Sequence, residues 1–71
     1  MMDKRTVTMF ADNMIKQYPE LFNDIIDFIY LAIDEIDEGG SPSHEWQLAY
    51  TSIEELIEEH IKNKQENESI D

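Results

Sequence analysis

The carboxylates in the stretch DEIDEGGSPSHEW, residues 34–46, have a spacing that could hold a divalent cation. If a twelve-residue calcium loop began at Asp34, oxygen ligands would fall at Asp34, Glu38 and Glu45, and the sixth position would be Gly39. The third position of such a loop also needs an oxygen ligand, and here it is Ile36. The stretch therefore favours a capped turn between two helices, and we expect no metal-binding residues.

A second acidic cluster, EELIEE over residues 54–59, has the spacing of a magnesium-binding motif. Its E-E-x-x-E letters resemble those of all-α nucleotide pyrophosphohydrolases of the MazG kind, which would imply a magnesium-dependent enzyme. In that family an acidic pair follows the motif, whereas here the acidic pairs precede it. Residues 17–61 also lack the Lys or Arg that would neutralise substrate phosphates. We expect no enzymatic activity, no catalytic residue and no cofactor, and keep this enzyme class as a third alternative.

The two histidines, His44 and His60, show no constellation for nucleophilic catalysis. No acidic residue stands three or four positions before His60, so the Glu-x-x-His spacing of di-iron bundles is absent. His60 falls on the apolar side of its predicted helix, beside Ile57 and Ile61. We therefore expect it to be a packed, hydrogen-bonded histidine in the core or at an interface.

Three helices are expected to position these residues. Apolar side chains recur every three to four residues in three segments, which predict helices over 4–17, 19–38 and 42–62. Asp3 is expected to cap the first helix. Pro19 suits the first turn of the second helix because its missing N–H costs nothing there. Gly39 is expected to end that helix in the left-handed conformation.

The predicted fold is all-α, with a short N-terminal helix packed on an antiparallel helical hairpin. These elements form a single domain over residues 1–63, and residues 64–71 form a disordered polar tail. We find neither a signal peptide nor an apolar run long enough for a membrane span, and there is no cysteine. The expectation is a soluble, cytoplasmic protein that does not contact a membrane.

The second predicted helix is apolar over an arc of about 160°, which is wider than one neighbouring helix covers. A chain of 71 residues also buries a modest share of its surface, which favours self-association. We therefore expect a homodimer in the form of a helical bundle. The residues predicted for its core or dimer contact are Leu21, Phe22, Phe28, Ile29, Trp46, Ile53 and Ile57.

The charge distribution is the strongest functional signal. Residues 17–61 carry twelve Asp and Glu and no Lys or Arg, and the net charge of the chain is −12. This segment therefore lacks the opposite-charge pairs that stabilise ordinary solvated helices. Leu31 falls within the acidic side of the second helix and is the predicted apolar anchor of a contact. The acidic stripe predicted to bind a partner consists of Glu20, Asp24, Asp27, Asp34, Glu35, Glu38, Glu54, Glu55, Glu58 and Glu59.

Such a surface repels nucleic acid and attracts basic proteins. Its charge density, about one negative charge per 2.5 Å of helix, is close to the roughly one per 1.7 Å of duplex DNA. In composition the chain is similar to small acidic inhibitors that mimic nucleic acid, including the anti-restriction and anti-CRISPR proteins that phages encode. The prediction is a non-enzymatic inhibitor or regulator that engages a basic, nucleic-acid-binding protein by charge mimicry. The alternative is a helical dimerisation or adaptor protein whose acidity serves solubility.

Overall fold

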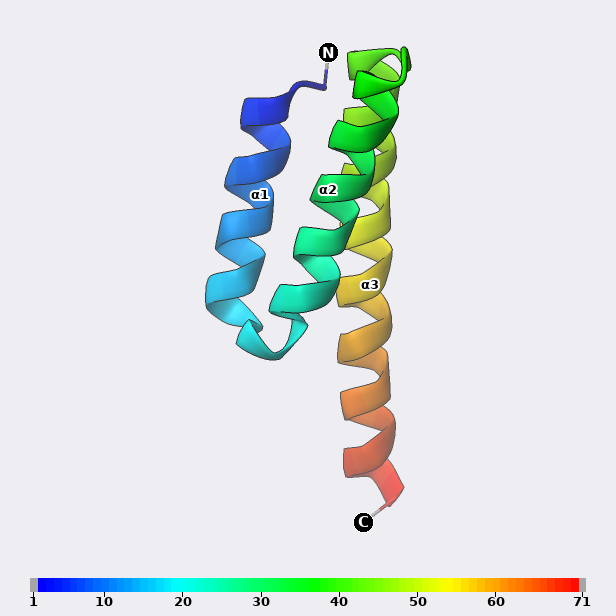
Figure 1. Ribbon diagram of the computed structural model, residues 1–71. Helices are drawn as coiled ribbons and strands as arrows, with labels where there is room; N and C mark the ends of the chain where they lie inside the picture. The colour runs from blue at the N-terminus through cyan, green and yellow to red at the C-terminus, as the bar shows by residue number, and fades with distance from the viewer. Residues whose placement is uncertain (1, 71) are drawn as a thin grey trace.

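A computed structural model describes the backbone of residues 2–70 and the side chains as far as Lys64 (Figure 1). The all-α prediction is confirmed, because the described residues form three α-helices and one 3₁₀ turn and contain no strand. The helices lie along one long axis, and the molecule measures 49 × 21 × 18 Å. The elements are α1 (Lys4–Gln17), η1 (Pro19–Leu21), α2 (Phe22–Asp37) and α3 (Pro42–Ile70).

The cap of α1 is the one that the sequence predicts. The Oδ1 atom of Asp3 accepts a hydrogen bond from the backbone N–H of Thr6 at 2.9 Å, which satisfies a donor that the helix leaves unpaired. That backbone hydrogen bond is the largest effect that lowers the pKa of the Asp3 carboxyl from its ordinary value. Asp3 therefore stays ionised at the positive end of the helix dipole.

The turn between α1 and α2 differs from the prediction. Pro19 does not begin α2 but begins η1, and α2 starts at Phe22. Proline is compatible with the first turn of either helix type, and the 3₁₀ turn reverses the chain while it buries Leu21. The backbone N–H of Leu21 closes this turn on the carbonyl of Tyr18 at 2.9 Å.

The connection between α2 and α3 depends on two adjacent glycines. Gly39 has a φ of 108°, so its predicted positive-φ helix end is confirmed. Its N–H donates to the carbonyl of Ile36 at 3.0 Å, and the N–H of Gly40 donates to the carbonyl of Glu35 at 2.8 Å. These two bonds satisfy carbonyls that the end of α2 would otherwise leave unpaired.

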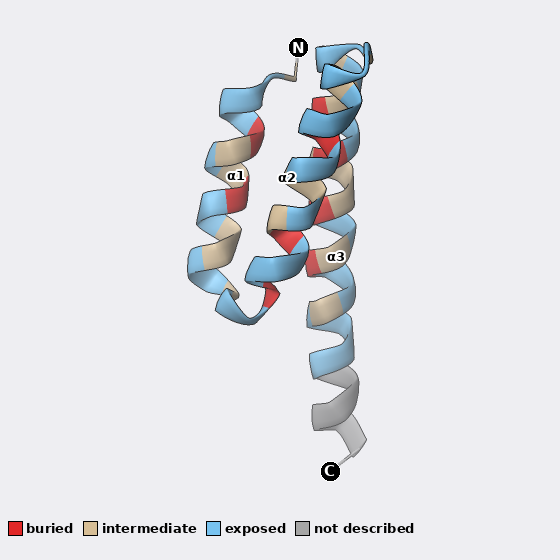
Figure 2. Ribbon diagram, in the orientation of Figure 1, coloured by how far each residue is buried: buried red, intermediate tan, exposed pale blue. Residues whose placement is uncertain are grey.

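The core is a narrow seam along the line where the three helices meet (Figure 2). Ile25, Ile53 and Val7 are its fully buried side chains, one from each helix. Beside it the rings of Phe10 and Tyr50 stack with centroids 4.3 Å apart, which joins α1 to α3. The buried residues of the seam are Val7, Ala11, Leu21, Ile25, Ala32, Trp46, Ala49, Ile53 and Ile57.

The residues predicted for the core or dimer contact fall into three groups. Four are buried within the single chain: Leu21, Trp46, Ile53 and Ile57. Phe28 and Ile29 are partly buried and pack against the seam. Phe22 is exposed over 49% of its surface, so it contributes little to this core.

α3 runs to Ile70, beyond the predicted end at residue 62. The side chains of residues 65–71 lie outside the described part, so the predicted disordered tail stays a prediction. Across residues 2–70, every helix is too short or too polar to pass through a lipid bilayer.

Candidate functional site

The acidic residues predicted to bind a partner come from three elements. Glu20 lies in η1, five more lie in α2 or at its C-terminal end, and four lie in the middle of α3. All ten side chains are exposed. Leu31, the predicted apolar anchor, is exposed over 58% of its surface in the middle of α2. The helices therefore direct these carboxylates away from the seam.

Few of these carboxylates have a cationic partner. Within residues 2–64 there are two ion pairs, Lys16 with Asp12 at 3.3 Å and His60 with Glu20 at 2.8 Å. Of the ten carboxylates predicted to bind a partner, Glu20 is the one that forms one of these two ion pairs. The other nine carboxylates form no ion pair with a side chain of residues 2–64.

His60 joins α3 to the turn between α1 and α2. Its Nε2–H donates to Oε2 of Glu20 at 2.8 Å, since an ionised carboxylate can only accept. Its ring also meets Tyr18 edge-on, with centroids 5.6 Å apart. These contacts agree with the expectation of a packed, hydrogen-bonded histidine.

The pKa of the Glu20 carboxyl is lowered from its ordinary value. The largest cause is a hydrogen bond with its own backbone, followed by desolvation, which acts in the opposite direction, and then by the hydrogen bond and charge of His60. Glu20 is therefore ionised at neutral pH, but part of its charge is already engaged within the molecule.

Two grooves on different sides of α3 divide the acidic residues. Glu35 and Glu45 line a groove between α2 and α3. Glu54, Glu55 and Glu58 line a groove between α1 and α3, together with apolar side chains of both helices. Of the predicted stripe, Glu35 therefore lines one groove, whereas Glu54, Glu55 and Glu58 line the other.

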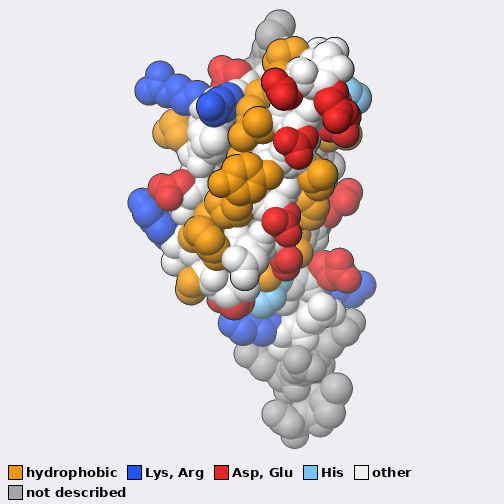
Figure 3. Space-filling view, viewed as in Figure 1, with side chains coloured by type: hydrophobic (Ala, Val, Ile, Leu, Met, Phe, Trp, Pro, Cys, Tyr) orange, Lys and Arg blue, Asp and Glu red, His pale blue; other side chains and the backbone are white. Residues whose placement is uncertain are grey.

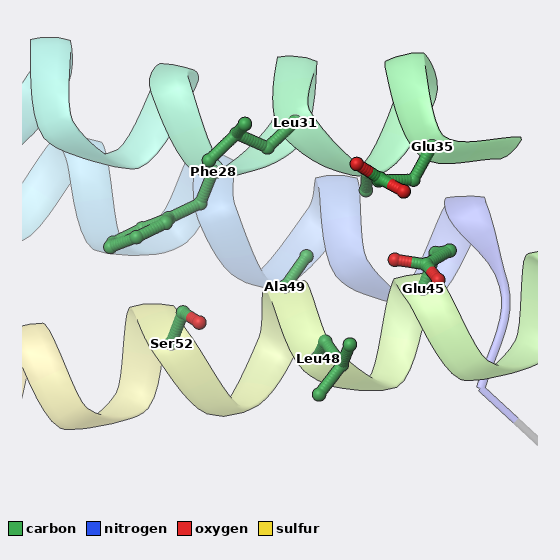
Figure 4. Close-up of a pocket in the computed structure, with 8 residues that line it drawn as sticks. Phe28, Leu31, Glu35, Glu45, Leu48, Ala49 and Ser52 are labelled. Atoms are coloured by element: carbon green, nitrogen blue, oxygen red, sulfur yellow. The ribbon is translucent and has the colours of Figure 1, made fainter. Parts of the chain in front are cut away.

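The groove between α2 and α3, called the α2–α3 groove below, has a volume of about 400 Å³ (Figure 4). Its floor is formed by Ala32 and Ala49, which are buried in the seam. Phe28 and Leu31 border it from α2, and Leu48 borders it from α3. Because the floor residues carry only methyl groups, the two helices leave a hollow between their larger side chains.

One end of the α2–α3 groove is strongly acidic. Figure 4 shows the carboxylates of Glu35, from α2, and Glu45, from α3, at the same end of the groove. Glu45 lies in the first turn of α3, where the helix dipole favours an anion, whereas Glu35 lies near the C-terminal end of α2, where the dipole opposes one. Neither has an ion-pair partner among residues 2–64.

A separate apolar strip follows another side of α2. This α2 strip consists of Phe22, Ile26, Tyr30 and Ile33, of which Tyr30 is the most exposed at 62%. Figure 3 shows apolar side chains gathered along the middle of the face that α1 and α2 form, with most of the acidic side chains on the α2 side and several basic ones over α1. The α2 strip therefore presents an uncharged surface on an otherwise acidic chain.

The stretch at residues 34–46 contains the turn between α2 and α3, which covers residues 38–41. Asp34 and Ile36 belong to α2, which continues to Asp37, so the first four positions of the calcium frame are helical. In the part of the chain with described side chains, no three His, Asp or Glu residues gather closely enough to hold a metal ion.

The four Glu residues of EELIEE lie on the exposed side of α3, and Lys62 lines a shallow hollow beside three of them.

No protein-family model, curated protein or solved structure matches this chain. The resemblance to pyrophosphohydrolases therefore stays a resemblance of a few letters.

Glu45 and Leu48 line the α2–α3 groove but were absent from the residues predicted to bind a partner.

The position of Leu48 gave a signal that could have been used. On a helical wheel with Ile53 at zero it falls at about 220°, among polar residues. Leu31 falls at about 200° from Ile29 on its own wheel, equally out of phase with the core side. One out-of-phase leucine on each of two neighbouring helices is the signal that could have located the groove.

Proposed function

We propose that this protein is a small, non-enzymatic inhibitor or regulator that engages a basic, nucleic-acid-binding protein by charge mimicry. One observation carries the proposal: the ten stripe carboxylates are exposed, and nine of them have no ion-pair partner among residues 2–64. Uncompensated charges of one sign steer an oppositely charged protein towards the surface and contribute to its specificity.

Helical geometry also supports mimicry. A helix rises about 1.5 Å per residue, so Asp24 and Asp27, and again Glu35 and Glu38, lie about 4.5 Å apart along α2, with Leu31 between the two pairs. Asp34, Glu35 and Glu38 crowd the end of α2 where the dipole disfavours anions, at a cost of about 0.3 to 1 kcal/mol each. A placement that works against local stability favours a role in binding over simple solubility.

The partner of this proposal carries a groove of Lys and Arg that normally holds nucleic acid. The chain itself is too acidic to bind nucleic acid or an anionic membrane surface. We also propose that the protein acts in the cytoplasm and that it works in the same general way as the acidic inhibitors that phages encode.

The test separates the position of charge from its amount. One variant neutralises four stripe residues (Asp24→Asn, Asp27→Asn, Asp34→Asn, Glu35→Gln), and a matched control adds four lysines on exposed positions of α1 (Thr6→Lys, Met9→Lys, Asn13→Lys, Gln17→Lys). Both variants change the net charge by +4. The measurement is the affinity for a basic protein captured from the native host, at several salt concentrations and with duplex DNA as competitor.

We expect the stripe variant to lose about 100-fold in affinity, with the control affected far less and both retaining the helical circular dichroism of the original chain. DNA and salt should each release the partner. An equal loss in both variants would mean that net charge alone matters, and no loss in the stripe variant would remove the proposal.

The second candidate function is a helical dimerisation or adaptor protein, and the α2 strip favours it. Two copies with a charge of −12 each repel one another, but an uncharged strip is where they could meet without placing carboxylates in contact. Two antiparallel hairpins joined through Phe22 and Tyr30 would form the helical-bundle dimer of the sequence analysis.

The double variant Phe22→Glu, Tyr30→Glu tests this candidate, because both side chains are exposed in the single chain and neither change disturbs the seam. The mass by light scattering should fall from dimer to monomer, while the control Leu48→Glu leaves it unchanged. Leu21 is unsuited to this test because it is buried in the seam. A monomeric mass for the original chain would end the dimer hypothesis.

A further inference from the structure

We infer that the α2–α3 groove binds an amphipathic helix of the basic partner, with apolar side chains against Leu31 and Leu48 and an arginine at Glu35 and Glu45. The inference rests on the proposed function, because it specifies where the partner docks and which chemistry it must present. It adds a requirement that charge mimicry alone does not have, namely apolar anchors at a fixed distance from a cation.

The apolar part of the groove has the character of a docking site for side chains. Leu31 and Leu48 are exposed over 58% and 49% of their surfaces, and the alanine methyl groups of the floor lie between them. Phe28 borders the same hollow and is only partly buried. A helix that laid apolar side chains here would remove these large side chains from water, which is the main driving force for helix-in-groove recognition.

The acidic end of the groove determines the sign of the charge that an occupant must carry there. A Cβ atom on Gly40 would lie 2.8 Å from the carbonyl oxygen of Glu35 and 3.2 Å from Oε2 of Glu45, so the chain at Gly40 passes close to both the end of α2 and the Glu45 carboxylate. Glu35 contributes a second carboxylate from the other helix. Two carboxylates without an ion-pair partner in residues 2–64 make an anionic occupant unfavourable and a cationic one favourable.

Arginine fits this end better than lysine. Its planar guanidinium carries five N–H donors and can bond carboxylates on two sides at once, whereas an ammonium group acts as a point charge. A cation here would also offset the unfavourable position of Glu35 at the C-terminal end of α2.

The length of the groove sets the spacing that the partner must have. Phe28 and Glu35 are seven residues apart on α2, which is about 10.5 Å or two helical turns. A docked helix of the same rise must therefore present apolar side chains at positions i and i+4 and arginine at i+7, all on one face.

The experiment uses the full chain, labelled with ¹⁵N, and a designed alanine-rich helical peptide with leucine at i and i+4 and arginine at i+7. Amide shifts on titration report both the affinity and the location of the bound peptide. We expect shifts at Leu31, Leu48 and Ser52. Peptides with serine in place of both leucines, or glutamate in place of the arginine, should bind at least about tenfold more weakly.

Matched protein variants separate the groove from general acidity. Glu35→Gln with Glu45→Gln should weaken peptide binding at least about tenfold, and Leu48→Gln should do the same without any change of charge. Thr6→Lys with Asn13→Lys makes the same change of net charge on α1, away from the groove, and should leave binding within about twofold.

The inference is overturned if the peptide causes no shifts in the groove, or if the serine peptide binds as well as the leucine peptide. Its failure is distinct from that of the proposed function. If the basic protein captured from the host depends on Asp24 and Asp27 but not on Leu48, charge mimicry stands and the groove has no role. If neutralising the stripe has no effect on that protein, the proposed function fails, whatever the peptide does.

Discussion

The seam and the α2–α3 groove are both built where α2 meets α3, yet they serve different purposes. In the seam, Ile25 and Ile53 are fully buried. In the groove, only alanines are buried, and Leu31 and Leu48 remain about half exposed. Side chains in phase with the helical period therefore provide stability, while those out of phase are left for a partner. Ala32, Ala49 and Phe28 belong to both regions, but Leu31 and Leu48 do not, so substitutions at these two leucines should separate binding from folding.

The largest expected effect comes from the seam. Ile53→Ala removes a fully buried side chain and should lower the free energy of unfolding by about 2 to 5 kcal/mol, a large part of the stability of so small a domain. The contrasting variant Leu48→Ala should change it by less than about 1 kcal/mol, because that side chain is half exposed. Urea denaturation followed by circular dichroism measures both. Similar losses in the two variants would erase the distinction between seam and groove.

A smaller effect is expected at the turn that joins the two helices. Gly39→Ala places a Cβ on a residue with a φ of 108° and should cost about 1 to 2 kcal/mol. Gly39→Asn should cost less, because asparagine tolerates positive φ better than alanine. The melting temperatures of the two variants, measured by thermal unfolding, show which substitution costs more stability. If the Gly39→Ala variant proved as stable as the original chain, the positive φ of Gly39 would not be what holds α2 and α3 in the register that the seam and the groove need.

The smallest effect concerns the contact between His60 and Glu20, at the opposite end of the bundle from the glycines. Because the pKa of Glu20 is lowered in the folded protein, its ionised form stabilises the fold at pH values above the ordinary glutamate pKa. This contribution is lost as the pH falls through the lowered value. The melting temperature of Glu20→Gln should therefore lie slightly below that of the original chain at neutral pH and converge with it in acid. A constant difference across that range would contradict the assignment.

The fold class was predictable because it depends on local patterns. The three apolar periodicities, the Asp3 cap and the positive φ of Gly39 follow from neighbouring residues alone, and the structure confirms them. The start of α2 was predicted wrongly because Pro19 fits both a 3₁₀ and an α-helical first turn, and the packing of Leu21 decides between them.

The candidate site was only partly predictable. Periodicity indicated which carboxylates avoid the core, and it identified Leu31 as an apolar residue on an acidic side. It could not show that Leu48 lies across a groove from Leu31, or that Glu35 and Glu45 share one end of it. Such neighbours are distant in the sequence, and they depend on how closely α2 approaches α3.

The alanine floor has a consequence for how this surface could diverge during evolution. Replacing Ala32 or Ala49 by a larger residue would fill the hollow and force the helices apart, so natural selection on folding would also preserve the shape of the hollow. Leu31 and Leu48 are under no such constraint, because their side chains project beyond the packed interior. Related chains could therefore acquire new specificities by exchanging these two side chains while they inherit the same scaffold.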